Sequence, residues 1–247
     1  MADWNDTSRS AQRLGSVPRA GGDVAGRAGY DEGLRKYMLS IYNYMTSGVL
    51  LTGIVALGAA ATGLAYAFAS GPLMWIVALA PLGFVMAMSF GLNRMSTATL
   101  QILFWSFAVV MGLSMSTIFL VFTGESIAST FFATAGAFAG LSLFGYTTKK
   151  DLSGFGTFLI MGVFGLVIAM LLNLFLQSGT LALVISILGV LIFAGLTAYD
   201  TQRLKQQYSV VRGTEMMGKV VIMGALNLYL DFINMFMFLL RMFGSRE

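Results

Sequence analysis

The chain has 247 residues, of which 57% are hydrophobic and only 11% are charged. Soluble globular domains carry about 25% charged residues, so lipid rather than water must cover much of this chain. The absence of cysteine and histidine excludes disulfides, thiol catalysis, zinc fingers and serine–histidine triads. The net charge of +4 does not indicate nucleic acid, because the basic residues flank hydrophobic segments, where they act as topology signals.

The first 30 residues are polar, rich in glycine and mixed in charge, and they lack the apolar stretch of a signal peptide. They predict a flexible cytoplasmic tail over residues 1–30 and a single transmembrane domain over residues 31–247. A short amphipathic helix from about Asp31 is expected to lead into the first span, which would then act as an uncleaved targeting signal.

Seven apolar segments follow the tail. A helix needs about 20 apolar residues to cross the hydrocarbon core, and segments of this length in lipid must be helical to satisfy their own backbone groups. The sequence therefore predicts an all-α integral membrane protein, a seven-transmembrane helix bundle. The expected spans are 45–68, 73–90, 100–122, 127–146, 155–176, 181–199 and 220–240, with a charged loop over 201–219.

The distribution of basic residues predicts the orientation. With the N-terminus in the cytoplasm, the inner segments hold 13 of the 15 Lys and Arg residues, and only Arg241 and Arg246 lie outside. This asymmetry follows the positive-inside rule, and an odd number of spans places the C-terminus outside. The short loops favour a bacterial inner (plasma) membrane.

Small residues recur four positions apart on the spans, a spacing that lets helices approach closely. We expect these residues to serve helix packing. The pairs are Gly58 with Thr62, Gly112 with Ser116, and Gly136 with Gly140.

One acidic residue stands out in the seventh span. Asp231 lies deep in this apolar segment, where an ionised carboxylate costs at least about 2.5 kcal/mol. It should therefore face the interior of the bundle. Asn227 and Asn234 share its helix face at positions i−4 and i+3, and Arg241 is expected roughly on the same side. This polar stripe predicts that the last helix is central in the bundle.

A second acid, Asp200, ends the sixth span. If that helix continues to about Tyr208, Asp200 lies inside the membrane boundary and can meet Asp231 on the antiparallel neighbour. Two touching carboxylates in a low dielectric cannot both ionise cheaply, so they would share one proton or bind a hard cation such as Ca²⁺. An alternative has Asp200 paired with Arg203 and Asp231 held by the asparagines.

The remaining charges are weaker signals. Arg94 is expected at the inner surface, as an anchor or as a counter-ion to the two aspartates. Glu125 and Asp151 precede or begin predicted helices, where acids commonly cap the helix or favour its dipole.

Three segments resemble the Bax inhibitor-1 family, also called the transmembrane Bax inhibitor motif family, and the similarity runs from about Tyr30 to the C-terminus. The segments are 195–203 (GLTAYDTQR), 227–234 (NLYLDFIN) and 146–152 (YTTKKDL).

The resemblance implies a last helix wrapped by six others and a pH-dependent calcium leak. The family's paired aspartates match Asp200 and Asp231, and its basic residues resemble Arg94 and Arg241. Some members carry an acid in the second span, which this sequence lacks. Some bacterial relatives modulate a membrane protease, and eukaryotic relatives suppress cell death.

Three functions follow as hypotheses. The first is a cation leak, most readily for Ca²⁺, through a channel gated by Asp200 and Asp231, with no cofactor. The second is a non-conducting regulator that binds a membrane protease or another partner. The third, an intramembrane aspartyl protease, is disfavoured because Leu228-Tyr229-Leu230 precedes Asp231 where those enzymes have Gly-x-Gly, and because no Pro-Ala-Leu motif is present. We therefore expect no enzymatic activity.

Overall fold

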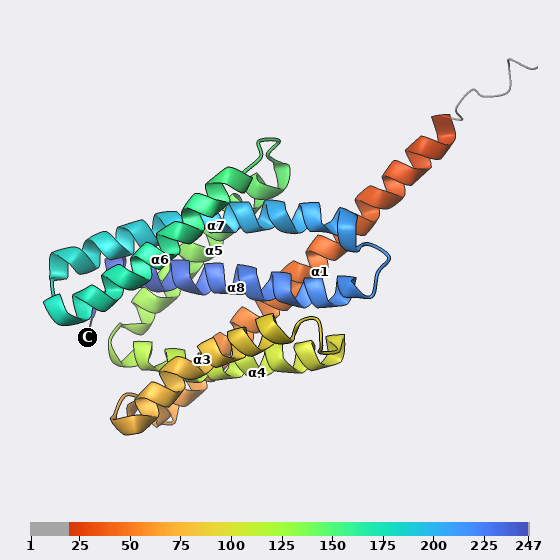
Figure 1. Ribbon diagram of the computed structural model, residues 1–247. Coiled ribbons are helices and arrows are strands. Elements are labelled where there is room, and N and C mark those ends of the chain that lie inside the picture. Colours follow the sequence, from red (N-terminus) through yellow and green to blue (C-terminus); the bar gives the residue numbers. More distant parts are fainter. Residues whose placement is uncertain (1–19, 247) are drawn as a thin grey trace, which may run out of the picture. The chain divides into compact units, whose positions relative to one another are not determined.

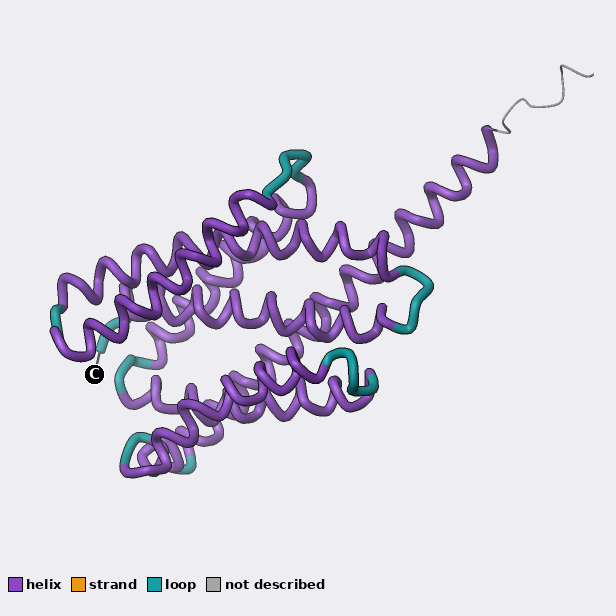
Figure 2. Tube along the Cα trace, in the orientation of Figure 1, coloured by secondary structure: helices purple, strands orange, loops and turns teal. Residues whose placement is uncertain are grey.

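The computed structural model describes the backbone of residues 20–246, and the side chains from Gly29 onward. Helices joined by short turns make up this part of the chain (Figures 1 and 2). The helices are α1 (Ala20–Ala61), α2 (Leu64–Phe68), α3 (Gly71–Gly91), α4 (Thr97–Met115), the 3-10 helix η2 (Ser116–Leu120), α5 (Gly124–Thr147), α6 (Ser153–Leu176), α7 (Gly179–Val211) and α8 (Met216–Phe243).

Seven segments of the described chain are long and apolar enough to cross a membrane. They are α3, α5, α6, α7 and α8, the part of α1 from Gly29 to Ala61, and α4 together with η2. The predicted all-α membrane fold with seven spans is confirmed.

The chain divides into two compact units, Met1–Lys36 and Tyr37–Glu247. The predicted flexible tail over 1–30 is helical from Ala20 onward, and its residues 1–19 lie outside the described residues. All features discussed below belong to the second unit.

Two predicted boundaries were wrong. The first span ends at Ala61 rather than at residue 68, because Gly63 adopts a left-handed conformation with φ of 77° and separates α1 from α2. The sixth span does not end at residue 199, since α7 continues to Val211 and leaves only residues 212–215 as the turn before α8. Thr201, Leu204 and Tyr208 are buried along this extension, and their spacing of three and four residues marks a packed helix face.

Helix α8 is the most buried of the seven spans. In its most apolar 18-residue window 67% of residues are buried, against 11% in α3 and in α6. It packs against α4, α5 and α7, and in Figure 1 it runs between α7 and α4. Consequently α8 meets mainly protein, whereas α3 and α6 present most of their side chains to lipid.

Glycines permit the closest helix approaches in this unit. A Cβ atom at Gly145 of α5 would overlap the carbonyl group of Ala198 on α7, and one at Gly156 of α6 would overlap the ring of Tyr199. The predicted packing role of Gly112 is confirmed, because a Cβ there would lie 2.7 Å from the carbonyl oxygen of Thr52.

The packing role predicted for three other glycines was wrong. A Cβ atom added at Gly58, Gly136 or Gly140 would meet no neighbouring atom within 4 Å, so these glycines face open space rather than another helix. The four-residue spacing is the same in both groups, and only the face of the helix distinguishes them.

The turn between α5 and α6 is fastened to α7 by two side chains. The Gln202 amide accepts a hydrogen bond from the Leu152 amide (2.9 Å) and donates one to the Lys150 carbonyl (2.7 Å). The Lys205 ammonium donates to the Tyr146 carbonyl (2.7 Å) at the end of α5, where a cation also favours the helix dipole. These bonds hold the C-terminal part of α7, including Asp200, against α5 and α6.

Substitution of Gly145 by alanine should destabilise the α5–α7 contact. The added methyl group has no room beside the Ala198 carbonyl, and overpacking of this kind costs about 1–3 kcal/mol. The measurement is the thermal unfolding midpoint in detergent. Gly140→Ala on the same helix is the matched control and should not lower the midpoint, because nothing lies near that position. Equal effects of the two variants would contradict the assigned contact.

Substitution of Gln202 by leucine should loosen the α5–α6 turn while leaving α7 helical. The substitution removes both hydrogen bonds from the side chain to the turn, and it leaves the Leu152 N–H and the Lys150 carbonyl without a protein partner. Each unpaired group destabilises the fold by about 1–3 kcal/mol where water does not replace the lost bond. Hydrogen exchange of the residue 148–153 amides should speed up. Gln206→Leu, an exposed position one turn later, should leave that exchange unchanged. Unaltered exchange in Gln202→Leu would show that the turn does not depend on this side chain.

Candidate functional site

Asp231 lies near the middle of α8 and is buried, with 5% of its surface exposed. Its Oδ2 atom has no hydrogen-bond partner among the described residues. Buried polar groups are normally paired, and an unpaired one in a native structure usually has a functional explanation. The predicted inward orientation of Asp231 is confirmed.

The packing of α7 against α8 sets the level of Asp200. The rings of Phe193 on α7 and Phe238 on α8 stack with centroids 5.9 Å apart. The helices are antiparallel neighbours, and Asp200 follows Phe193 by seven residues just as Asp231 precedes Phe238 by seven. The two carboxyl groups therefore lie at the same level of the helix pair.

The surroundings of Asp200 differ from those of Asp231. Asp200 is half-buried. It lies on the part of α7 that α5 and α6 approach closely, because Gly145 of α5 and Gly156 of α6 have no side chains there. Arg203 is exposed, and no ion pair joins it to Asp200 within the described residues. Asp200 thus occupies the edge of the site, and Asp231 its interior.

The asparagines of α8 do not hold Asp231. The Asn234 amide donates to the Leu230 carbonyl of its own helix at 2.8 Å, and both Asn227 and Asn234 are only half-buried. No hydrogen bond from either asparagine to Asp231 supports the alternative among the described residues.

Arg94 and Arg241 lie at opposite ends of the bundle. Arg94 is exposed in the turn between α3 and α4. Arg241 is exposed near the end of α8 and lines a cleft beside α6 and α7, with its guanidinium carbon 5.9 Å from the Phe238 ring centroid. Neither forms an ion pair with an aspartate in the described part of the chain.

A buried hydrogen bond that the motifs did not reveal ties α1 to α8. The hydroxyl groups of Thr52 and Tyr229 lie 2.7 Å apart, and the Thr52 hydroxyl also lies 2.9 Å from the Ala108 carbonyl of α4, to which it donates. Tyr229 is fully buried between the rings of Phe104 and Phe107. In the sequence, the only feature that pointed to Tyr229 was its position two residues before Asp231 in the segment 227–234.

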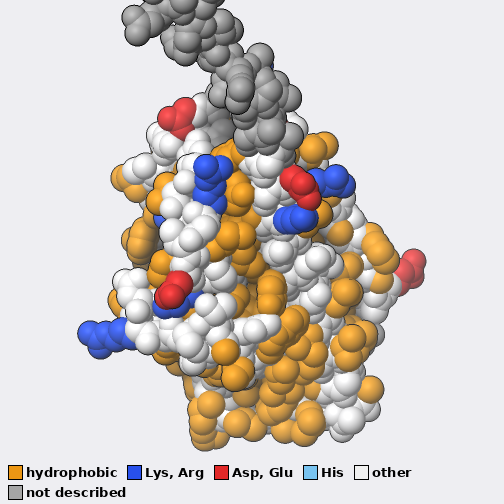
Figure 3. All heavy atoms as spheres, turned by 90° about the vertical axis from the view of Figure 1, so that its right-hand side faces the viewer, with side chains coloured by type: hydrophobic (Ala, Val, Ile, Leu, Met, Phe, Trp, Pro, Cys, Tyr) orange, Lys and Arg blue, Asp and Glu red, His pale blue; other side chains and the backbone are white. Residues whose placement is uncertain are grey.

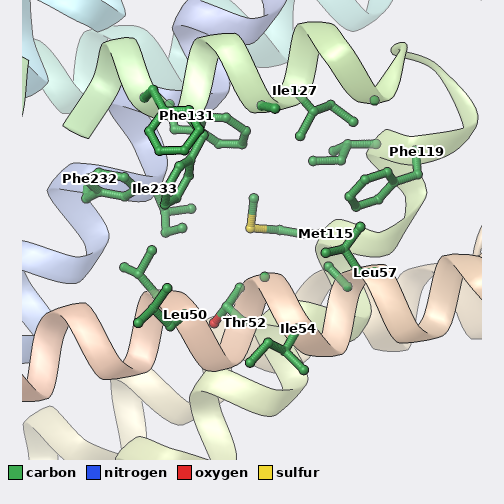
Figure 4. A pocket seen from close by; sticks show the side chains of 18 residues that line it. Leu50, Thr52, Ile54, Leu57, Met115, Phe119, Ile127, Phe131, Phe232 and Ile233 are labelled. Atoms are coloured by element: carbon green, nitrogen blue, oxygen red, sulfur yellow. The ribbon is translucent and has the colours of Figure 1, made fainter. Parts of the chain in front are cut away.

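A cavity of about 320 Å³ lies between α1, η2, α5 and α8 (Figure 4). Apart from Thr52, whose hydroxyl already has two partners, its walls are apolar. Among the wall residues are Leu50, Met115, Phe131 and Ile233. Such a cavity suits hydrocarbon and offers no ligand to a cation, so it is not the candidate site.

Basic residues gather at one end of the bundle. Figure 3 faces the side where the α3–α4 and α7–α8 turns lie, and Lys and Arg side chains appear there among broad hydrophobic areas.

Asp151 lies in the α5–α6 turn at this end. Its carboxylate accepts hydrogen bonds from the Ser153 hydroxyl (2.6 Å) and the Ser153 backbone amide (2.9 Å), and these bonds hold the pKa of Asp151 below its ordinary value. Asp151 thus binds the first backbone amide of α6, although Leu152 occupies the helix cap position.

Comparison with known proteins identifies the family. A family model described as "Inhibitor of apoptosis-promoting Bax1" matches residues 34–247. An uncharacterized protein of Caulobacter vibrioides is 44% identical over 254 residues, covering 98% of this chain and 99% of its own length. The inner membrane protein YbhL of Escherichia coli K12 is 44% identical over 234 residues, covering 93% and 98%.

A third relative, the uncharacterized protein RP147 of Rickettsia prowazekii, is 45% identical over 220 residues, which covers 88% of this chain and 93% of the relative. These matches extend over nearly the whole transmembrane unit and agree with the motifs at 146–152, 195–203 and 227–234. The chain is a multi-pass membrane protein that belongs to the Bax inhibitor-1 family.

Proposed function

We propose that this protein is a pH-sensitive cation leak, most readily for Ca²⁺, gated by Asp200 and Asp231. The observation that carries the proposal is the buried carboxyl group of Asp231, which has an oxygen without a hydrogen-bond partner in the described chain and sits level with Asp200. An ionisable residue inside a membrane span is costly and usually marks an ion or proton pathway.

The chemistry of the pair supplies the gate. With one proton between them, the two carboxyl groups form an O–H···O⁻ hydrogen bond that joins α7 to α8. Loss of that proton leaves two like charges in a low dielectric, and their repulsion pushes the helices apart. Acid therefore favours the joined state, and cation flux rises as the pH rises.

The same pair suits passage of a hard cation better than its storage. Two carboxylates offer at most four oxygen atoms, whereas Ca²⁺ takes about six to eight oxygen ligands. No group of three or more metal-binding side chains comes together within the described residues. A cation at the pair would complete its shell with water and leave again, as conduction requires.

The gate lies on a central helix. Helix α8 is the central helix that the others enclose, which accords with its high burial and with its contacts to α4, α5 and α7. The protein acts without chemistry on a substrate and needs no bound cofactor. It resides in a bacterial inner membrane, as the name of the relative YbhL states for that protein.

Substitution of Asp231 by asparagine should abolish the pH dependence of the leak. The asparagine amide can donate to the Asp200 carboxylate at every pH, so α7 and α8 stay joined. In liposomes loaded with a Ca²⁺ dye, the parent's flux should vary by about tenfold or more over a pH series, and that of the variant should stay low and flat. Asp200→Asn should behave in the same way.

The matched control is Glu125→Gln, which makes the same chemical change at an exposed position at the start of α5. This control should keep the parent's pH profile. An Asp231→Asn profile identical to the parent's would refute the gate. A parent that carries no flux at any pH would refute conduction altogether and leave the non-conducting regulator, bound to a membrane protease or another partner, as the function to pursue.

The proposed orientation places the N-terminus in the cytoplasm and the C-terminus outside, as the basic residues indicate. Because the chain has no cysteine, single cysteines report sidedness without background. In intact cells an impermeant maleimide should label Thr180→Cys, exposed just after the α6–α7 turn, and should not label Thr214→Cys, exposed in the α7–α8 turn, until the cells are opened. The reverse pattern would invert the topology.

A further inference from the structure

A second cleft lies at the opposite end of the bundle from the α3–α4, α5–α6 and α7–α8 turns. It has a volume of about 510 Å³ and is formed by the second half of α6, the first turns of α7 and the end of the chain. Its rim includes Leu171, Leu174 and Leu183, which are 54%, 69% and 48% exposed, so the cleft opens on the lipid-facing surface.

Two arginines, Arg241 and Arg246, line this cleft. In the second unit, the other Lys and Arg residues lie at or near the turns at the far end of the bundle, at positions 94, 149, 150, 203, 205, 212 and 219. The positive-inside rule explains basic residues on the side where most of them gather, so it does not explain the two arginines in this cleft at the other end. Within the described residues neither forms an ion pair, and no acidic side chain lines the cleft.

Of the other polar side chains in the cleft, Asn173 leaves a donor available, whereas Ser186 does not. The Asn173 side-chain oxygen already accepts from the Ser178 amide at 3.1 Å, which leaves the Asn173 NH₂ group to donate. The Ser186 hydroxyl is buried and donates to the Ala182 carbonyl at 2.9 Å. The cleft therefore combines guanidinium and amide donors with apolar walls. This combination suits an anion that carries a hydrocarbon chain.

We propose that this cleft binds an anionic phospholipid, with its phosphate at Arg241 and Arg246 and an acyl chain along Leu171 and Leu183. Arginine pairs with phosphate through parallel hydrogen bonds, and basic pockets between membrane helices are known to hold lipid headgroups. The volume is within the range of ordinary ligand pockets, roughly 300–1,000 Å³. The lipid is drawn from the bilayer because the cleft is open toward it.

The test is native mass spectrometry of the full chain in detergent, titrated with phosphatidylglycerol or with zwitterionic phosphatidylcholine. The parent should bind phosphatidylglycerol about tenfold more tightly or better. The double variant Arg241→Gln/Arg246→Gln should lose this preference, whereas Arg94→Gln, which removes an exposed arginine at the other end, should keep it. Equal affinity of the parent for both lipids, or an unchanged preference in the double variant, would overturn the proposal.

Two further arms distinguish a bound lipid from a small anion. Ala182→Trp fills the cleft but retains both arginines, so it should also weaken phosphatidylglycerol binding, and it remains informative if the double variant fails to fold. Inorganic phosphate in large excess should not displace the lipid. Displacement by phosphate at concentrations equal to that of the lipid would assign the site to a small anion instead and overturn the lipid assignment.

Discussion

A carboxyl group enclosed by helices inside a membrane has no access to bulk water, and this constraint organises the interior of the protein. Asp231 is such a group: it lies in the most buried of the seven spans, and its Oδ2 atom has no hydrogen-bond partner among the described residues. The cost of such a group is several times the net gain from an ordinary hydrogen bond.

The three family segments supply hydrogen bonds that join different parts of the bundle. The segment 195–203 carries Asp200 and Gln202, and Gln202 bonds the turn 146–152 through Leu152 and Lys150. The segment 227–234 carries Asp231 and packs on α7, while its Tyr229 bonds Thr52 of α1. Gln202 thus ties the α5–α6 turn to α7, and Tyr229 ties α8 to α1.

Hydropathy was sufficient to find all seven spans, because lipid allows only self-satisfied helices. It failed at the end of α7, where Arg203 and Lys205 suggested a loop although Thr201, Leu204 and Tyr208 form a buried face. The expected position of Arg241 was also wrong. Ten residues after Asp231 the helix has turned through about 1000°, which is roughly 80° short of three full turns. Sequence spacing likewise could not separate Gly112 from Gly140, since only the partner helix decides which glycine is needed.

The length of α7 has a mechanical consequence. Its 33 residues span about 50 Å, well beyond the roughly 30 Å of hydrocarbon, and the helix stays packed along its extension through Thr201, Leu204 and Tyr208. Asp200 lies half-buried on this helix, and Gln202, two residues later, attaches the helix to the α5–α6 turn. A rotation of α7 at the aspartates would therefore be transmitted through Gln202 to residues 150–152.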